Sequence, residues 1–246
     1  IAMRFSVFAV ASVPDTATTR QMFGLDDLDD KSVSKVLFHR RKQQTGSSET
    51  LRWDQRAIAG ISLIEHSVDK VQMESLHLPG QREEEMLQAY YRSALRNACL
   101  VSWDGARADL PLIHFRTLMH GLSYPAYWQR LRDDGDLHRV ICDWLTQVPD
   151  DRPGLDETAR KLGYPGLLRR DEDDVHAAWL QGRHAEIQAF TELTALNGYL
   201  LALRLFATTG EISRHDSARV MNKLRDELGR RDGVHLTEFL AAWSGS

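Results

Sequence analysis

The chain has 246 residues, of which 42% are hydrophobic and 27% are charged, a balance that is typical of globular domains and excludes a disordered or fibrous protein. Its formal net charge is −4, so overall charge does not attract nucleic acid and any such contact must be local. No apolar run approaches the roughly 18 residues that span a bilayer, and the N-terminus lacks the features of a signal peptide. We therefore expect a cytoplasmic protein without a membrane partner.

The first predicted element is a strand that is buried on both faces. Residues 4–13 (RFSVFAVASV) alternate with a period of two, so that the odd-numbered residues from Phe5 to Ala9 share one face and Phe8 and Val10 share the other. Both faces are apolar, as in a central strand covered by helices on each side. The proline that follows cannot extend the strand, which predicts a turn there.

The remaining elements follow from apolar periodicity and from turn residues. Residues 16–56 are polar and predict a short helix followed by a loop. Predicted strands cover residues 57–62, 70–78 and 99–103, of which the first two favour an antiparallel pair. Predicted helices cover residues 82–98, 110–120, 155–162, 173–180, 185–206, 214–228 and 235–243, while residues 137–147 fit either a strand or a helix.

This order of elements predicts an α/β fold. A strand, a pair of strands, a helix, another strand and a second helix follow one another, which indicates a mixed sheet with helices packed on it. We expect residues 1–210 to form this domain. Residues 211–246 are expected to form a C-terminal helical extension that packs on the domain.

Four segments, in this order, are similar to one family of nucleases. They are VFAVASVPD (7–15), VSWDGARADLPLIHFRTLMHG (101–121), LDETARKLGYPG (155–166) and EIQAFTELTALNGYLLALRL (186–205). Together they resemble the predicted 3′–5′ exonucleases related to the exonuclease domain of family B DNA polymerases, a group within the DEDD superfamily. The resemblance implies a ribonuclease H-like fold, with a five-stranded mixed sheet flanked by helices and an active site across the end of the first strand.

The family's chemistry is phosphodiester hydrolysis by two divalent ions that four carboxylates hold. Two of these carboxylates are an Asp and a Glu that lie two positions apart on the first strand, a spacing that puts both on one face. The matching residues of this chain are Ala9 and Ala11. A methyl group cannot bind a metal ion, so the resemblance implies that half of the ligand set is missing.

The other motifs of the family are also altered. The segment that resembles Trp-Asn-Gly-x-x-Phe-Asp runs from Trp103 to Asp109 and keeps the final carboxylate. A Tyr and an Asp one helical turn apart correspond here to Phe190 and Thr194, and a looser match puts a further lost Asp at Val140. Asp109 is then the only secure ligand. We expect no bound metal in the chain as written, and Mg²⁺ or Mn²⁺ only if an active parent exists.

The origin of the two alanines has two interpretations. The residues before Met3 resemble a cloning remnant, which is compatible with Ala9 and Ala11 being engineered substitutions in an active exonuclease. The changes at Phe190 and Thr194 affect the same site and are not substitutions chosen for inactivation. They favour natural degeneration, and hence a pseudoenzyme.

Neighbouring acids offer another alternative, in which a metal site has moved. Asp15, Asp104, Asp143 and Glu192 lie near the motifs, and at least two of them would have to converge with Asp109. Simpler roles suit them better. Two are typical turn residues, and Glu192 is expected to lie off the catalytic face of its helix.

Local basic and aromatic residues provide candidate contacts to nucleic acid. A basic stretch between residues 38 and 56 ends at Arg56, and two further candidates, Trp103 and Arg107, flank the second motif. Arginine and lysine can bind phosphates while tryptophan stacks on bases; the alternative is a solvated loop. The candidates in the basic stretch are Arg40, Arg41, Lys42, Arg52 and Trp53.

Three functions follow from these patterns. The first is binding of a nucleic-acid strand or a 3′ end in the inherited cleft without cleavage. The second is an active metal-dependent 3′–5′ exonuclease whose carboxylates at positions 9 and 11 were replaced by alanine. The third is a protein-interaction scaffold in which the cleft is vestigial and the helical tail docks a protein partner.

Overall fold

The computed structural model describes residues 3–67, 70–146, 148 and 151–244. Ile1 and Ala2, interpreted above as a cloning remnant, lie outside these residues. No helix in the described part of the chain is long and apolar enough to cross a membrane.

A five-stranded mixed sheet forms the centre of the molecule, in the order β3-β2-β1-β4-β5. The pairs β1–β2 and β2–β3 are antiparallel, whereas β1–β4 and β4–β5 are parallel. The ribonuclease H-like α/β fold predicted from the resemblance is therefore confirmed. The strands are β1 (Phe5–Pro14), β2 (Arg56–His66), β3 (Val71–His77), β4 (Cys99–Ser102) and β5 (His138–Val140).

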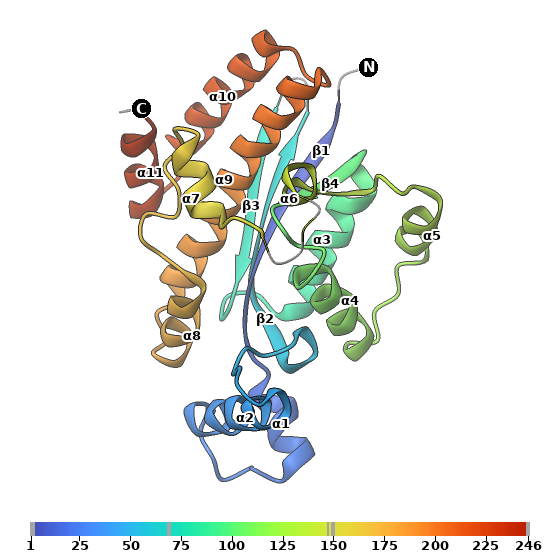
Figure 1. Ribbon diagram of the computed structural model, residues 1–246, viewed down its shortest axis with the longest axis vertical. Helices are drawn as coiled ribbons and strands as arrows, with labels where there is room; N and C mark the ends of the chain where they lie inside the picture. The colour runs from blue at the N-terminus through green and yellow to red at the C-terminus, as the bar shows by residue number, and fades with distance from the viewer. Residues whose placement is uncertain (1–2, 68–69, 147, 149–150, 245–246) are drawn as a thin grey trace.

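Helices cover both faces of the sheet (Figure 1). One face is covered by α7 (Leu155–Lys161), α8 (Glu172–Leu180), α9 (His184–Thr209), α10 (Arg214–Leu228) and α11 (Val234–Ser244). The other is covered by α3 (Glu83–Arg96), α4 (Asp109–Met119) and α5 (Pro125–Asp133). At the end of β1 lie α1 (Thr16–Phe23), α2 (Asp30–Thr45) and a 3₁₀ turn (Trp53–Gln55), while α6 (Ile141–Leu145) follows β5.

The alternation of β1 divides the core into two layers, as the sequence predicts. Phe5, Val7 and Ala9 belong to the cluster that α9 fills, whereas Phe8 belongs to the cluster beneath α3 and α4. Since β1 pairs with strands on both sides and is buried on both faces, its side chains determine how closely the helices approach. Gly198 of α9 shows this, because a Cβ there would lie 3.2 Å from a methyl group of Val7.

Three of the predicted elements differ from the structure. Residues 16–56 form two helices and a 3₁₀ turn rather than one short helix and a loop, so the basic residues 40–42 lie on α2. Capping stabilises α2, because Asp29 accepts a hydrogen bond from the Ser32 backbone and Gly46 ends the helix in the left-handed region. Helix α5 was not predicted, and residues 137–147 divide into β5 and α6 as far as Leu145.

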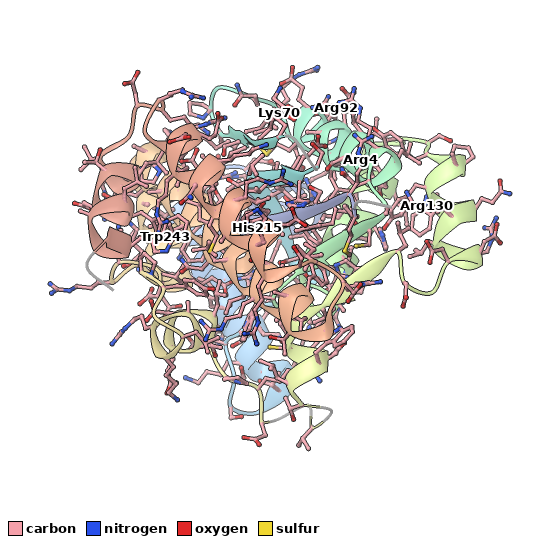
Figure 2. All side chains as sticks on the ribbon, turned by 90° about the horizontal axis from the view of Figure 1, so that it is seen from above. Arg4, Lys70, Arg92, Arg130, His215 and Trp243 are labelled. Carbon is pink, nitrogen blue, oxygen red and sulfur yellow. The ribbon has the colours of Figure 1, made fainter. Side chains whose placement is uncertain are left out.

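The C-terminal helices pack on α9 and continue its core. Residues of α10 and α11 belong to the same hydrophobic cluster as the α9 face of the sheet. The buried carboxylate of Glu192 on α9 lies 2.6 Å from His235 Nε2 on α11. Figure 2 shows Trp243 of α11 and Arg130 of α5 on opposite sides of the molecule. The division at residue 210 stays a prediction.

A buried ion network joins β1, α3 and α4. Arg116 of α4 contacts Asp15 at 2.5 Å and Glu83 at 2.6 Å, and its side chain is only 8% exposed. Glu83 also accepts from the Ile58 backbone N–H and lies 2.7 Å from His120 Nε2. Asp15 in turn caps α1. One guanidinium group therefore fixes the end of β1 and the start of α1 against the helices that follow.

We expect Arg116→Met to lower the free energy of unfolding by about 3–5 kcal/mol, because it leaves two buried carboxylates without their cation. Arg92→Met is the control, since Arg92 pairs with Glu74 at the surface (Figure 2) and both side chains are more than 40% exposed; its loss should cost less than about 1 kcal/mol. Urea unfolding measures the free energy of unfolding of both variants. If both variants lose the same amount, the buried network stabilises the fold no more than a surface ion pair does.

Candidate functional site

The candidate site is a cavity where β1 has one free edge. Strand β1 pairs with β2 along its whole length, but it pairs with β4 only from Phe5 to Val7. A cavity of about 460 Å³ opens beyond this point and is lined by Ala9, Val10 and Ser12 of β1. The pairing of β1 with β2 shifts register between Ala11 and Ser12, where β2 carries one extra residue, Ala59. Incomplete parallel pairing is thus what makes the site.

The walls combine apolar packing with charged groups. The start of α4 and the segment before it line one side, and α9 lines another. Three arginines and three acids are among the lining residues, so their formal charges balance. The aromatic and charged members are Arg52, Trp53, Arg56, Trp103, Asp104, Arg107, Asp109, Glu172 and Phe190.

Four of the six positions that the resemblance matches to the family's site residues meet in this cavity, and the loosely matched Val140 does not line it. Ala9, Asp109, Phe190 and Thr194 all line it. Ala11 does not line it: its methyl group is 1% exposed and belongs to a cluster with residues of α8 and α9. Side chains of the two helices fill the space beside position 11. Ala9 is also buried, at 2% exposure, and belongs to the cluster under α9, but unlike Ala11 it lines the cavity.

Asp109 lies at the first turn of α4, close to the turn that follows β4. Gly105 permits this approach, since a Cβ at that position would come within 2.7 Å of Ser102 Oγ and 3.2 Å of Asp109 Oδ2. Burial is the main cause that raises the pKa of Asp109 to about 7, and the negative charge of Glu172 adds to it. The positive charge of Arg56 acts in the opposite direction. Asp109 is thus a carboxyl group that gains a proton near neutral pH.

The residues of α9 offer no carboxylate to the cavity. Thr194 Oγ1 donates a hydrogen bond to the Phe190 carbonyl oxygen at 2.7 Å, so its hydroxyl group is already engaged within the helix. Phe190 packs beside Ala11 and has no hydroxyl group. This side of the cavity is consequently apolar, with neither a hard anionic ligand nor a group that could orient water.

The neighbouring acids that could have formed a moved metal site have other partners. Arg152 binds both Asp104, at 2.7 Å, and Asp143. Asp15 is bound by the buried network at the end of β1. Glu192 is bound by His235 and does not line the cavity. None of the four converges with Asp109 as an unpaired ligand.

The side chains that line the cavity do not offer enough carboxylate oxygens to bind a pair of divalent ions. Magnesium and manganese sites of this kind need several carboxylate oxygens around them. Of the acids that line the cavity, Asp104 and Glu172 are held in ion pairs with arginines. Within the described ranges, no group of three or more His, Cys, Asp or Glu side chains is arranged to hold a metal ion.

The candidate nucleic-acid contacts separate into two groups. Arg52, Trp53, Trp103 and Arg107 line the cavity. Trp53 is 40% exposed, and its ring lies 5.4 Å from that of Phe115. The basic residues of α2 are outside the lining and have local partners instead. These are Phe23 for Arg40, the Thr50 carbonyl for Arg41 and Glu49 for Lys42.

Two lining residues were not selected from the sequence. Arg56 begins β2, and its Nη2 lies 2.7 Å from Glu172 Oε1 at the start of α8. The sequence placed Arg56 in a basic stretch whose arginines and lysines could contact phosphates, but it did not place Arg56 beside Glu172. Glu172 lay in an acidic run (171–174) that is typical of a helix N-terminus, and Asp171 is indeed the N-cap of α8. Nothing in the local sequence indicates that the two residues meet.

The fold and the cavity define a ribonuclease H-like α/β protein with its candidate site at the free edge of the first strand. The model of one family, described as a predicted 3′–5′ exonuclease related to the exonuclease domain of PolB, matches residues 48–243. The chain belongs to this family. The match begins after β1, so positions 9 and 11 are compared with the family's acids through the sequence resemblance alone. No curated protein matches the chain.

The packing around position 11 predicts unequal costs for restoring the two acids. Ala11→Glu would bury a carboxylate among apolar side chains of α8 and α9, and we expect a loss of about 3 kcal/mol or more in the free energy of unfolding. Ala9→Asp can direct its carboxylate into the cavity and should cost clearly less. Thermal unfolding compares the two variants, and an equal or smaller loss for Ala11→Glu would contradict the packing described here.

Asp109 predicts a specific dependence of stability on pH. Because its folded-state pKa of about 7 exceeds the ordinary value of 3.8, the folded protein keeps a proton that the unfolded chain releases. This contribution to stability is complete below about pH 4 and is lost as the pH rises to about 7. Asp109→Asn should therefore gain stability relative to the wild type across this window and then level off.

Urea unfolding at a series of pH values measures this difference. Asp136→Asn is the control for the loss of one carboxylate, because Asp136 has a side chain that is 82% exposed. A constant difference between Asp109→Asn and the wild type from acid to neutral pH would be inconsistent with a raised pKa.

Proposed function

We propose that the chain binds a single nucleic-acid strand in the cavity at the free edge of β1 and does not hydrolyse it. One observation carries this proposal. The cavity brings Arg52, Trp53, Trp103 and Arg107 together with the altered motif positions. Arginines that bind phosphates and rings that stack on bases are the parts that single-strand binding uses. The family supports the same class of ligand, because its members are described as exonucleases.

The cavity suits one strand better than a duplex. Its volume of about 460 Å³ is in the range of small-molecule pockets, about 300–1,000 Å³, which admits a nucleotide but not a double helix. Trp53 lines the cavity and is 40% exposed. Its ring is available to stack on an unpaired base. A single strand offers such bases, whereas a duplex must first break base pairs.

The absence of hydrolysis follows from the residues that line the cavity. Efficient two-metal cleavage depends on carboxylates that hold both ions and on a charge clamp for the transition state. Position 9 carries a methyl group, position 11 lies in the core, and the hydroxyl group of Thr194 is bonded within α9. One protonatable carboxyl group, that of Asp109, supplies neither requirement. Loss of the other acids also removes negative charge that would repel phosphates.

The proposal predicts metal-independent binding of a short single strand. A fluorescent oligonucleotide of about ten nucleotides should bind equally with EDTA or Mg²⁺ and more weakly as the salt concentration rises. Trp53→Ala should weaken binding about tenfold, since stacking is lost. Trp144→Ala is the control, because Trp144 is 50% exposed but does not line the cavity. Binding that is absent at low salt would refute the proposal.

A second experiment tests the lack of hydrolysis. We expect no degradation of the strand by the wild type with Mg²⁺ or Mn²⁺, and none by Ala9→Asp/Ala11→Glu, because the α9 acid is still missing and position 11 is packed by α8 and α9. Gel analysis of a labelled strand, with catalytic turnover checked at excess substrate, measures this. Metal-dependent degradation by the double variant would identify the chain as an inactivated exonuclease instead.

A further inference from the structure

Arg56 differs from the other cations of the cavity in how it is held. Its guanidinium group pairs with Glu172, which belongs to a distant helix, and this carboxylate side chain is 59% exposed. Arg52, by contrast, is held by two hydrogen bonds of 2.9 and 2.7 Å to Asp54, within the same turn of the chain. The partner of Arg56 can therefore move into water more easily than the partner of Arg52.

Arg56 also keeps unused hydrogen-bonding capacity. Its side chain is only 24% exposed, and its Nε is buried without a hydrogen-bond partner among the described residues. A buried donor of this kind costs free energy until an acceptor reaches it. Its charge extends into the cavity, because it lowers the pKa of the carboxyl group of Asp109. An anion in the cavity would thus meet a partly desolvated cation.

The charge balance of the cavity determines what such an anion must displace. Of the three acids among the lining residues, Asp104 is paired with Arg152 outside the lining and Asp109 has a pKa of about 7, so Glu172 is the acid that most directly opposes a phosphate at Arg56. Asp104 is held by Arg152 and is 32% exposed, whereas Glu172 is the more exposed acid. Exchange of one anion for another on Arg56 leaves the number of buried charges unchanged, which avoids the cost of desolvating an additional charge.

We infer that Arg56 is the phosphate anchor of the cavity, and that Glu172 occupies it until a backbone phosphate of the bound strand replaces the carboxylate. This inference rests on the proposed function, since it names the group that holds the strand. The planar guanidinium fork suits a phosphate group, which can accept two parallel hydrogen bonds from it. Glu172 then acts as an internal competitor that weakens binding of anions.

The test is a double-mutant cycle on binding of the labelled single strand. Arg56→Gln should weaken binding about tenfold and reduce the salt dependence of log K by about 0.7, the value for one phosphate contact. Glu172→Gln should strengthen binding about threefold or more, because the competitor is gone. In the Arg56→Gln background, Glu172→Gln should change affinity less than about twofold, since the two residues act through each other.

Arg92→Gln and Glu74→Gln form the matched control, because this pair has a similar length of 2.6 Å on α3 and β3 and does not line the cavity. Arg56→Lys keeps the charge and should bind with intermediate affinity, which separates a binding defect from misfolding. If the wild type binds the strand and Arg56→Gln binds it with the same affinity and salt dependence, the role of Arg56 is overturned but the proposed function is not. Failure of the wild type to bind would overturn the proposed function as well.

Discussion

The unequal pairing of β1 is the constraint on which the rest of the molecule depends. Its antiparallel partner β2 follows it to Pro14, whereas its parallel partner β4 leaves it after Val7. The first half of β1 is therefore a central strand, buried on both faces, and the second half has one open edge. Helices α4 and α9 approach this edge from opposite faces of the sheet, and the cavity is the space that they leave.

Charge pairing inside the cavity supports the proposal that the chain is not a metal-dependent nuclease. Where the family's chemistry needs carboxylates around two cations, the lining here has arginines that hold the carboxylates in ion pairs. Burial raises the pKa of Asp109 to about 7, although the charge of Arg56 acts in the opposite direction. Under the proposed function, a cavity with these arginines and aromatic walls would bind a strand through exchange of anions and through stacking. It does not provide the concentrated negative charge that would hold magnesium.

The sequence predicts the fold well because the decisive signals are local. The period-two alternation of β1 gives its two buried faces, and the long apolar pattern near residues 185–206 gives α9. Helix α2 was missed because most of its residues are polar and it buries only Val33, Ser34 and Leu37. Its helical state depends on its two caps, which periodicity does not detect. Helix α5 was not predicted because it buries one residue, a tyrosine, and otherwise offers mainly a proline at its first turn as a sign of a helix start.

The site was predicted only in part, since its geometry depends on contacts between distant segments. The motif residues 9, 109, 190 and 194 do meet, as a resemblance in motif order and spacing implies. The burial of Ala11 depends on α8, and no property of the strand itself indicates it. The basic stretch already included Arg56, but its pairing with Glu172 joins the starts of β2 and α8, so the local sequence could not indicate that the two residues meet.

The central claim is that the cavity lacks the anionic ligands to hold two divalent ions. Anomalous diffraction from crystals soaked in manganese tests it most directly. The account predicts no pair of manganese peaks beside Asp109 and position 9. Two well-occupied manganese ions at that place, with Asp109 among their ligands, would contradict it.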